Sequence, residues 1–496
     1  MTAVDIIGLV VLTLYLICLI YVTIFCLMQL HLLIKYLRAR KRVAEISGHS
    51  KEVDWPQVTV QLPVYNERYV IERLIDNIVQ FDYPKSRLEI QILDDSTDDT
   101  TLLAKRKVEQ YGQQGFDIKL IRRPERTGFK AGALDYGLKS AKGEFIAIFD
   151  ADFLPRPDFL KSTIQHFEDP SVGVVQTRWE HINQGYSLIT ELQAFQLNVH
   201  FTVEQSAREF AGYLLQFNGT AGVWRKQTIN EAGGWQADTL TEDLDLSYRA
   251  QLKKWRIVYL EGVGSPAELP AEMNGLKSQQ YRWMKGGAET AKKIIPSVWR
   301  SDLNFTQKFH ATIHLLSSAI FVFVFVLAIM SVPLIYYIKV VEYDPTPLSV
   351  FLIGMLSIVA VYYVANVQSS WHKLPRVKAL IKFVIMFPLF LALSMGLSLH
   401  NSIAVLQGYL GRRSAFVRTP KFNIQEISDS LKRRTYLDYN LNLTTIFEGL
   451  LFLYFTCAVI YGITTDVGAF LFFHILLAMG FGSIFYYSVV HLGLKK

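Results

Sequence analysis

Two aspartates separated by one residue, Asp150 and Asp152, directly follow the apolar run 144–149. Residues i and i+2 of an extended segment point the same way, so both carboxylates would face one site. Carboxylate oxygens are ligands that Mg²⁺ and Mn²⁺ prefer, and a metal there would bridge to a diphosphate. Such triplets also arise by chance, but two bare carboxylates at the end of a buried strand are costly. We therefore favour a metal site.

A second acidic pair, Asp94 and Asp95, ends the apolar run 88–93. Adjacent carboxylates repel each other unless a cation or a hydrogen-bond donor compensates. The ring N–H and ribose hydroxyls of a nucleotide are suitable donors. The segment 96–99 precedes a predicted helix, so a cluster of N-cap residues explains the same acids equally well.

The run 58–62 leads into a proline, an aromatic residue and an acid, namely Pro63, Tyr65 and Glu67. Together these side chains would cradle a base ring, although an ordinary turn uses the same residue types. Further along, Lys130 lies in the turn 126–133, where glycines let the backbone approach a phosphate at a helix N-terminus. Neither motif is specific by itself.

Two further motifs come later in the chain. Glu242 and Asp243 begin a predicted helix after Thr241, a residue suited to the N-cap. The two acids either complement the helix dipole or place Asp243 as a general base. Before the next apolar run, Arg282 would clamp phosphate and Trp283 would stack on a sugar. A snorkelling arginine beside an interfacial tryptophan fits that pair equally well.

The elements that must position these residues form an α/β unit over residues 55 to about 300. Apolar strand-like runs alternate with helical patterns, which predicts a mostly parallel sheet covered on both faces. Ligands bind such sheets at the carboxyl ends of the strands, where the acidic motifs fall. The predicted strands are 58–62, 88–93, 118–122, 144–149, 173–177 and 257–260, and the predicted helices are 68–80, 100–111 and 130–140.

Membrane segments flank this unit. The chain has 496 residues, of which 51% are hydrophobic, and its long apolar runs lie at both ends. They are 6–33, 314–338, 348–367, 381–399, 443–463 and 467–490, and each approaches or exceeds the ~20 residues that span a bilayer. The net charge of +7 comes largely from basic residues beside these runs, as in 35–42, which argues against nucleic acid. The three cysteines lie inside apolar runs and predict neither a disulfide nor a zinc site.

The motifs follow one another in a characteristic order, and the chain resembles the membrane-embedded family 2 glycosyltransferases of the cellulose synthase superfamily. It is most similar to the cellulose-synthase-like enzymes that make mannan, glucomannan or glucan. The segments that carry the resemblance are LPVYNER (62–68), IQILDDSTDDT (90–100), KAGAL (130–134), AIFDADF (147–153), HFTVEQ (200–205), FNGTAGVWR (217–225), EAGGW (231–235), TEDLDLSYRA (241–250) and QQYRW (279–283).

The resemblance implies a Rossmann-like GT-A domain over 44–300, after an N-terminal membrane helix in 1–43 and before membrane or interface helices in 301–496. It implies an inverting reaction with Asp243 as the base and Mg²⁺ or Mn²⁺ on Asp150 and Asp152. The implied donor-binding residues are Pro63, Tyr65, Glu67, Asp94, Asp95, Lys130 and Arg282. The implied acceptor-binding residues are Phe217, Asn218, Gly219, Thr220, Glu242, Gln279 and Trp283.

A run in 411–435 is similar to the gating loop of these enzymes, whose motif is F-x-V-T-x-K. Here Phe416, Thr419 and Lys421 match, whereas Arg418 stands where the motif has valine. The implied function is processive synthesis of a β-1,4-glucan or mannan from UDP-glucose or GDP-mannose, with export of the growing glycan. The alternatives are a non-processive enzyme that makes a glycolipid, and a nucleotide-gated transporter or channel.

Charge placement predicts the topology of the membrane segments. Nucleotide sugars are cytoplasmic and the basic cluster 35–42 marks the inside, so the catalytic domain is expected there with the N-terminus outside. The basic loop 412–434 should also be inside, which requires an odd number of crossings between 346 and 410. We expect the segment 378–410 to lie along the interface or re-enter, because Pro388 interrupts it and 400–402 is polar. Five crossings remain.

Overall fold

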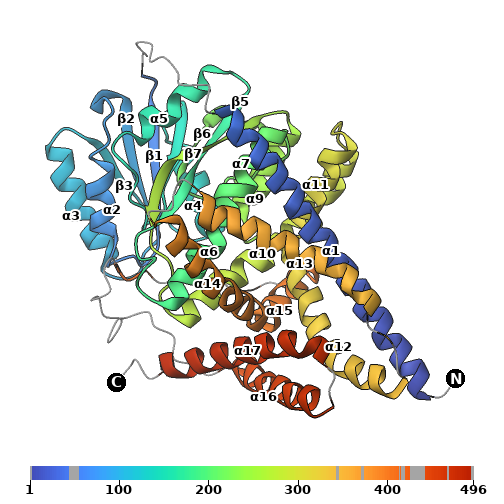
Figure 1. Ribbon diagram of the computed structural model, residues 1–496. Helices are drawn as coiled ribbons and strands as arrows, with labels where there is room; N and C mark the ends of the chain where they lie inside the picture. The colour runs from blue at the N-terminus through green and yellow to red at the C-terminus, as the bar shows by residue number, and fades with distance from the viewer. Residues whose placement is uncertain are drawn as a thin grey trace.

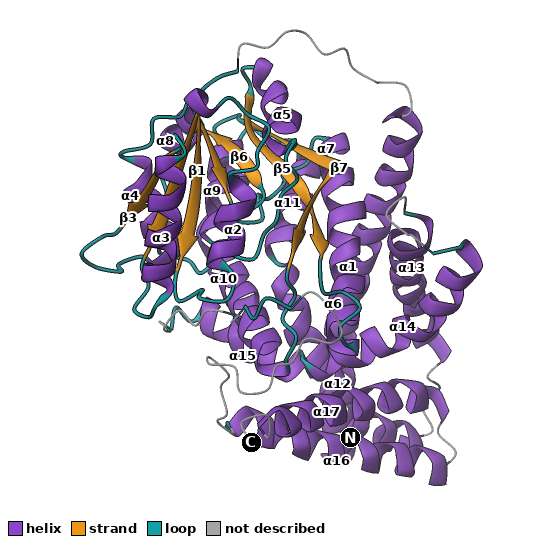
Figure 2. Cartoon of the chain, turned by 90° about the vertical axis from the view of Figure 1, so that its left-hand side faces the viewer, coloured by secondary structure: helices purple, strands orange, loops and turns teal. Residues whose placement is uncertain are grey.

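The computed structural model describes residues 3–43, 55–341, 344, 346–369, 374–412, 414, 419, 421–424, 442–465 and 468–492. The helix α1 runs along the molecule from the sheet domain to the far end (Figures 1 and 2). The sheet lies at one end, and α12, α16 and α17 lie at the other.

In the described chain, one seven-stranded sheet has the order β3-β2-β1-β4-β6-β5-β7. Every neighbouring pair is parallel except those of β6, which runs antiparallel to both β4 and β5. The strands are β1 (Val58–Val64), β2 (Leu88–Asp94), β3 (Asp117–Ile121), β4 (Phe145–Ile148), β5 (Val172–His181), β6 (Gly222–Arg225) and β7 (Arg256–Ala267). The sheet confirms the predicted GT-A-like α/β class.

Helices cover both faces of this sheet. Those of the domain are α2 (Ile71–Ile78), α3 (Thr100–Gln113), α4 (Phe129–Leu138), α5 (Phe159–Ile164), α6 (Leu188–Val199), α7 (Gln205–Ala211), α8 (Lys226–Glu231), α9 (Glu242–Leu252), α10 (Met273–Arg300) and α11 (Phe305–Leu315). Short 3₁₀ or π turns lie at Lys85–Arg87, Gln165–Glu168, His200–Glu204, Ser317–Ala319, Thr346–Phe351, Val364–Gln368 and Gly468–Phe470.

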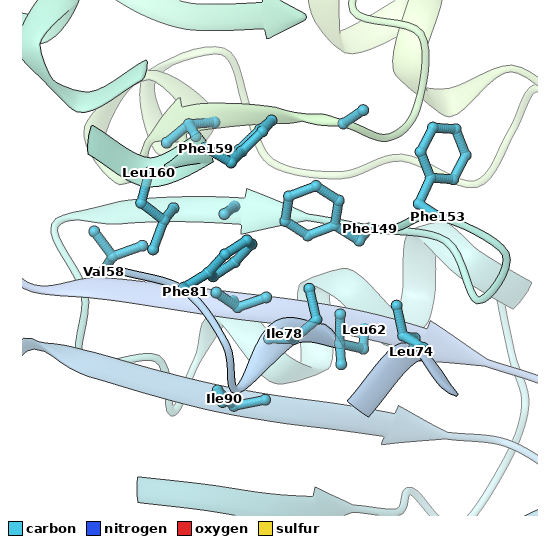
Figure 3. Close-up of a cluster of buried hydrophobic side chains, with 14 of the residues drawn as sticks. Val58, Leu62, Leu74, Ile78, Phe81, Ile90, Phe149, Phe153, Phe159 and Leu160 are labelled. Carbon is cyan, nitrogen blue, oxygen red and sulfur yellow. The ribbon is translucent and has the colours of Figure 1, made fainter. Parts of the chain in front are cut away.

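One face of the sheet packs against α2 and α5 around an aromatic cluster (Figure 3). Phe149 at the end of β4 meets Phe159 of α5 with ring centroids 4.8 Å apart. The opposite face is covered by α4, α8 and α9, with Leu134 and Leu246 fully buried. Because both faces are covered, β4 is a continuous apolar run, whereas in β1 and β2 apolar residues alternate with the buried polar residues Thr59, Gln61, Glu89 and Gln91.

The structure differs from the predicted strands at the far side of the sheet. The sequence did not predict β6, a short strand whose Val223 and Trp224 are buried on opposite faces of the sheet and therefore show no alternation. Strand β5 and its neighbour, the edge strand β7, also extend beyond their predicted ends, because residues 178–181 pair with 264–267 after a register shift. Polar residues in that stretch hid the pairing.

Six helical segments in the described chain are long and apolar enough to cross a membrane. The helices that form them are α1 (Ala3–Val43), α12 (Ile320–Val341), α13 (Leu352–Tyr363), α14 (Arg376–Gly396), α16 (Leu443–Thr464) and α17 (Leu471–Leu492). They correspond to the six predicted apolar runs. The chain is thus built like an integral membrane protein.

The segment predicted to lie at the interface forms two helices, α14 and α15 (Ser398–Tyr409). Pro388 lies inside α14, so the expectation that it interrupts the helix was wrong. The break comes instead near Leu397, after which α15 packs along α10. Length and composition do not distinguish α14 from the other spans, and the five-crossing topology stays a prediction.

The domain is docked onto the membrane helices through α1 and α10. Leu32, Leu33 and Tyr36 of α1 pack against Val203 and Ala207 of the domain. At the other end, the Lys277 ammonium of α10 forms a buried ion pair of 2.6 Å with Glu448 of α16. The helix that carries Arg282 and Trp283 is therefore fixed between the sheet domain and the C-terminal helices.

Candidate active site

Three neighbouring parallel strands, β2, β1 and β4, end side by side and bring their following residues together. The N–H of Asp95 donates to the carbonyl of Val64 at 3.0 Å, so the chain after β2 lies against the chain after β1. Asp150 follows β4 at the same edge. The predicted nucleoside and metal residues therefore lie along one edge of the sheet.

The charge on Asp95 is compensated by an arginine that the sequence analysis missed. Arg123 donates to both oxygens of Asp95, at 2.8 and 2.7 Å, and both side chains are almost fully buried. Such a paired contact is among the stronger charge-assisted hydrogen bonds. Arg126, from the same turn, stacks over the ring of Tyr65 with 3.4 Å between the guanidinium carbon and the ring centroid.

Asp94 is held by its own loop. Its carboxylate accepts from the N–H of Ser96 at 2.9 Å and from the hydroxyl of Thr101 at 2.6 Å, and Arg122 lies 3.5 Å away. The signal for these partners was present in the sequence, because three arginines (Arg122, Arg123 and Arg126) follow the strand that neighbours β2. Protein groups thus supply the compensation that we had assigned to the nucleotide.

Lys130 joins the first aspartate of the acidic triplet to the acceptor-side loop. It lies in the first turn of α4, and its ammonium donates to Asp150 at 2.5 Å and to the carbonyl of Gly219 at 2.9 Å. Burial alone would lower the pKa of Lys130, but Asp150, Glu242 and Asp243 outweigh it and the pKa is raised. The Lys130 ammonium therefore stays charged between Asp150 and the loop that contains Gly219.

Asp243 lies beside this group. Gly219 has φ +80°, and a Cβ placed on it would lie 3.0 Å from Asp243 Oδ2 and 3.5 Å from Lys130 Nζ. The pKa of Asp243 is raised to about 7, mainly by burial and further by the nearby Glu242, while Lys130 acts in the opposite direction. A carboxylate with a pKa near neutrality is suited to accept a proton. The structure therefore brings the predicted base and Asp150 into one site.

The helix that carries Asp243 begins as predicted, at Glu242 after Thr241. Thr241 occupies the predicted N-cap position, but its side chain forms no capping hydrogen bond with the described residues of the first turn. Its hydroxyl lies instead 3.0 Å from the hydroxyl of Thr290 in α10. Thr241 therefore ties α9 to α10.

Asp152 has a different surrounding from Asp150. It is buried, and it accepts from the Lys421 ammonium at 2.7 Å and from the N–H of Glu268 at 3.2 Å. Arg282 donates to the hydroxyl of Thr419 at 2.8 Å. Two of the three residues of the predicted loop motif, Thr419 and Lys421, therefore lie at the site, and Phe416 lies outside the described residues.

The two aspartates fit a divalent metal. Among the described residues, groups of three or more His, Cys, Asp or Glu suited to a metal are absent. Mg²⁺ usually uses only one or two carboxylates together with phosphates and water, so Asp150 and Asp152 suffice. Each carboxylate is now paired with an ammonium group, from Lys130 and Lys421 respectively. Both carboxylates therefore already bind a positively charged group, as they would bind a metal ion.

Four of the predicted acceptor residues divide into two groups. Phe217 is fully buried against Trp224 with ring centroids 5.4 Å apart, so its side chain belongs to the core. Thr220 accepts from the N–H of Asp150 at 2.9 Å and fixes the acidic triplet. Asn218 and Trp283, in contrast, line a cavity.

This cavity has a volume of about 1050 Å³ and extends from Asp243 toward the apolar helices, which places it at the upper end of ligand-pocket sizes of about 300–1,000 Å³. Side chains from α1, α12, α13, α14 and α17 line it, together with Asn218, Asp243 and Trp283. His200, in the HFTVEQ segment, joins Glu204 to Asn218 with 2.9 Å contacts on both ring nitrogens. The cavity connects the predicted base with the membrane region.

Comparisons with known proteins agree with this geometry. Residues 56–286 match the family model "Glycosyltransferase like family 2". The chain is 40% identical over 253 residues to "Glucomannan 4-beta-mannosyltransferase 7" of Arabidopsis thaliana, covering 50% of this chain and 46% of that protein. It is 41% identical over 263 residues to "Probable glucomannan 4-beta-mannosyltransferase 7" of Oryza sativa subsp. japonica, covering 52% and 45% respectively. These matches lie over the sheet domain and agree with the family 2 resemblance of its motifs.

These matches span about half the length of the curated relatives. A solved structure, "Mannosyltransferase PcManGT from Pyrobaculum calidifontis in complex with GDP-Man and Mn2+", aligns with a TM-score of 0.53 at 19% identity. It covers 80% of this chain and 100% of that one. At this identity the likeness supports the fold.

Proposed function

We propose that this protein is an inverting glycosyltransferase that transfers a hexose from a nucleotide sugar to a growing β-linked mannan or glucan. The observation that carries the proposal is the placement of Asp243, whose pKa is raised by burial, beside Lys130 and at the mouth of the cavity. The relatives are named glucomannan 4-beta-mannosyltransferases, which favours mannose as the transferred sugar.

The residues of the site have separable roles in this proposal. Asp243 takes the proton from the acceptor hydroxyl as that oxygen attacks the anomeric carbon of the donor, whose diphosphate leaves. Lys130 and Arg282 offer positive charge to the departing diphosphate, which stabilises the transition state. A direct displacement of this kind inverts the anomeric centre and needs no covalent sugar intermediate.

Asp150 and Asp152 would hold Mg²⁺ or Mn²⁺, which supplies further positive charge to the donor diphosphate. On the nucleoside side, Tyr65 under Arg126 offers a stacking surface, and the Arg123–Asp95 pair fixes the loop beneath it. GDP-mannose is the proposed first donor and UDP-glucose the comparison donor.

The cavity supports processive synthesis with export of the glycan. An acceptor that enters it from Asp243 passes Trp283, on which a sugar ring can stack, and continues among α1, α12 and α13. Sealed vesicles containing the purified protein should form long, enzyme-digestible glycan from GDP-mannose or UDP-glucose alone.

Two other outcomes of that experiment favour different functions. A single sugar attached to lipid would favour the non-processive alternative. Solute flux without release of nucleoside diphosphate would favour the nucleotide-gated transporter or channel. In the second case the protein would not be a transferase, and Asp243 would have no catalytic role.

We also propose that the catalytic domain is cytoplasmic, with five crossings and the basic loop 412–434 on the same side. The support is charge placement: basic residues lie in the last turns of α1, at 38–42, and Asp344 lies between two apolar segments. In a protein with Cys18, Cys26 and Cys457 replaced by alanine, an impermeant maleimide should label a cysteine at position 344 from outside intact cells. A cysteine at position 416 should stay unlabelled until the cells are opened. Strong labelling at 416 from outside would contradict this topology.

A further inference from the structure

We propose that Glu268 is a positioning residue that holds the segment 421–424 against the donor site, an inference that rests on the proposed function. Glu268 follows β7, close to the end of the sheet where Asp152 lies. It is almost completely buried, at 4% exposure. Among the residues that the structure describes, its partners belong either to the segment 421–424 or to residues that contact that segment.

The carboxylate of Glu268 binds the backbone of the segment. Its Oε1 accepts from the N–H of Phe422 at 2.8 Å, and its Oε2 accepts from the N–H of Ile424 at 3.2 Å. Each oxygen thus binds an alternate residue of one short stretch. A neutral, isosteric side chain would have only one acceptor oxygen for these two donors, because an amide carries an NH₂ group in the other position.

The backbone of Glu268 connects that segment to the acidic triplet. Its N–H donates to Asp152 Oδ2 at 3.2 Å, and its carbonyl accepts from the Lys421 ammonium at 2.9 Å. Lys421 itself contacts Asp152 at 2.7 Å. One residue therefore fixes the carboxylate, the ammonium and the chain that carries the ammonium.

Arg73 of α2 completes the attachment. It donates to Asn423 Oδ1 at 2.6 Å and lies 3.9 Å from Glu268 Oε2, so its guanidinium contacts both the segment and the carboxylate that holds it. Phe422 and Ile424 are buried with Ala271 in a small apolar cluster. The segment is thus attached by charge, by backbone hydrogen bonds and by apolar packing at the same place.

The contribution of Glu268 to the reaction follows from this geometry. The described contacts of Glu268 do not include Asp243 or Lys130, whereas the segment that it holds supplies Lys421 at Asp152, and the nearby Thr419 contacts Arg282. If the segment is held only part of the time, apparent donor affinity falls in proportion to that fraction. Weakening the hydrogen bonds of Glu268 to the segment should therefore raise the donor KM and change kcat much less.

The test compares Glu268→Gln with the wild-type protein in two measurements. Peptide-level hydrogen exchange without donor should become faster at Phe422 and Ile424 in the variant. The donor KM, measured from released nucleoside diphosphate, should rise by about tenfold, as expected for loss of one charge-assisted hydrogen bond. Glu89→Gln is the matched control, because Glu89 is also buried, accepts from the N–H of Lys142 and pairs with Lys119, near the start of β2 and at the opposite end of that strand from Asp94. It should leave both measurements near the wild-type values.

A second variant covers the case in which Glu268→Gln does not fold. Asn423 has φ +57°, so Asn423→Gly suits the backbone while removing the oxygen that binds Arg73. It should change exchange and KM in the same direction. Unchanged exchange in the folded variants, or faster exchange with an unchanged KM, would overturn the positioning role. Wild-type protein that releases no diphosphate from either donor would instead refute the proposed function, and the exchange result would still decide whether Glu268 holds the segment.

Discussion

Asp243→Asn will remove nearly all transfer while leaving the protein folded and able to bind the donor. The amide has the size of the carboxylate but cannot take a proton, and loss of a general base typically costs ~10²–10⁴-fold in rate. Asp243 also belongs to the first turn of α9, where a neutral side chain loses only the small favourable interaction with the helix dipole. The expected loss therefore appears in kcat far more than in stability.

The measurement is diphosphate release under saturating donor, with donor binding followed separately by calorimetry. Asp135→Asn is a suitable control, since Asp135 forms an exposed ion pair with Lys139 on α4. Turnover of Asp243→Asn within a few-fold of wild type would mean that Asp243 only complements the helix dipole and that another group acts as the base.

The pH dependence of the reaction follows from the same carboxylate. Burial and Glu242 raise the pKa of Asp243 to about 7, so a growing fraction of the base is protonated as the pH falls through 7. The rate should therefore decrease about tenfold per pH unit on the acid side. Glu242→Gln removes the neighbouring charge and should move this acid limb to lower pH. A profile that stays flat down to pH 5 would contradict the assignment.

Much of the domain was predictable because its strands are buried on both faces. Apolar runs such as 58–62 and 88–93 predicted β1 and β2, and the acids after them mark the ligand edge of a parallel sheet. The same logic failed for β6, because a strand of four residues is too short to show a recognisable pattern of apolar residues. Local patterns therefore found the long central strands and missed the short antiparallel one.

The contacts within the site were less predictable because they join distant parts of the chain. Lys421 and Asp152 are separated by 269 positions, and Arg123 reaches Asp95 from the next strand. Periodicity carries no information on such pairs. Motif order placed Asp150, Lys130 and Asp243 in one site, but it could not show that the side chain of Phe217 belongs to the core.

Removal of divalent metal should stop the reaction, and added Mn²⁺ or Mg²⁺ should restore it. Asp150 and Asp152 follow β4 at the same edge as the nucleoside residues, and each is now neutralised by an ammonium group. A departing nucleoside diphosphate carries more negative charge than Lys130 and Arg282 together can balance, so the transition state needs a further cation. Metal charge stabilisation is worth several kcal/mol, which corresponds to ~10²-fold or more in rate.

Asp152→Ala tests which carboxylates serve the metal. With one ligand removed, restoration after EDTA should require a higher Mn²⁺ concentration, and Mn²⁺ binding measured by electron paramagnetic resonance with nucleoside diphosphate present should weaken in parallel. Asp158→Asn is the matched control, because Asp158 lies in the same segment but forms an exposed ion pair with Arg156. Full activity in chelator would contradict the metal site, and Lys130, Lys421 and Arg282 would then have to supply all the positive charge at the diphosphate. In that case Lys421→Met should reduce turnover by a similar factor, because its ammonium would remain on Asp152 throughout the reaction and form part of that charge.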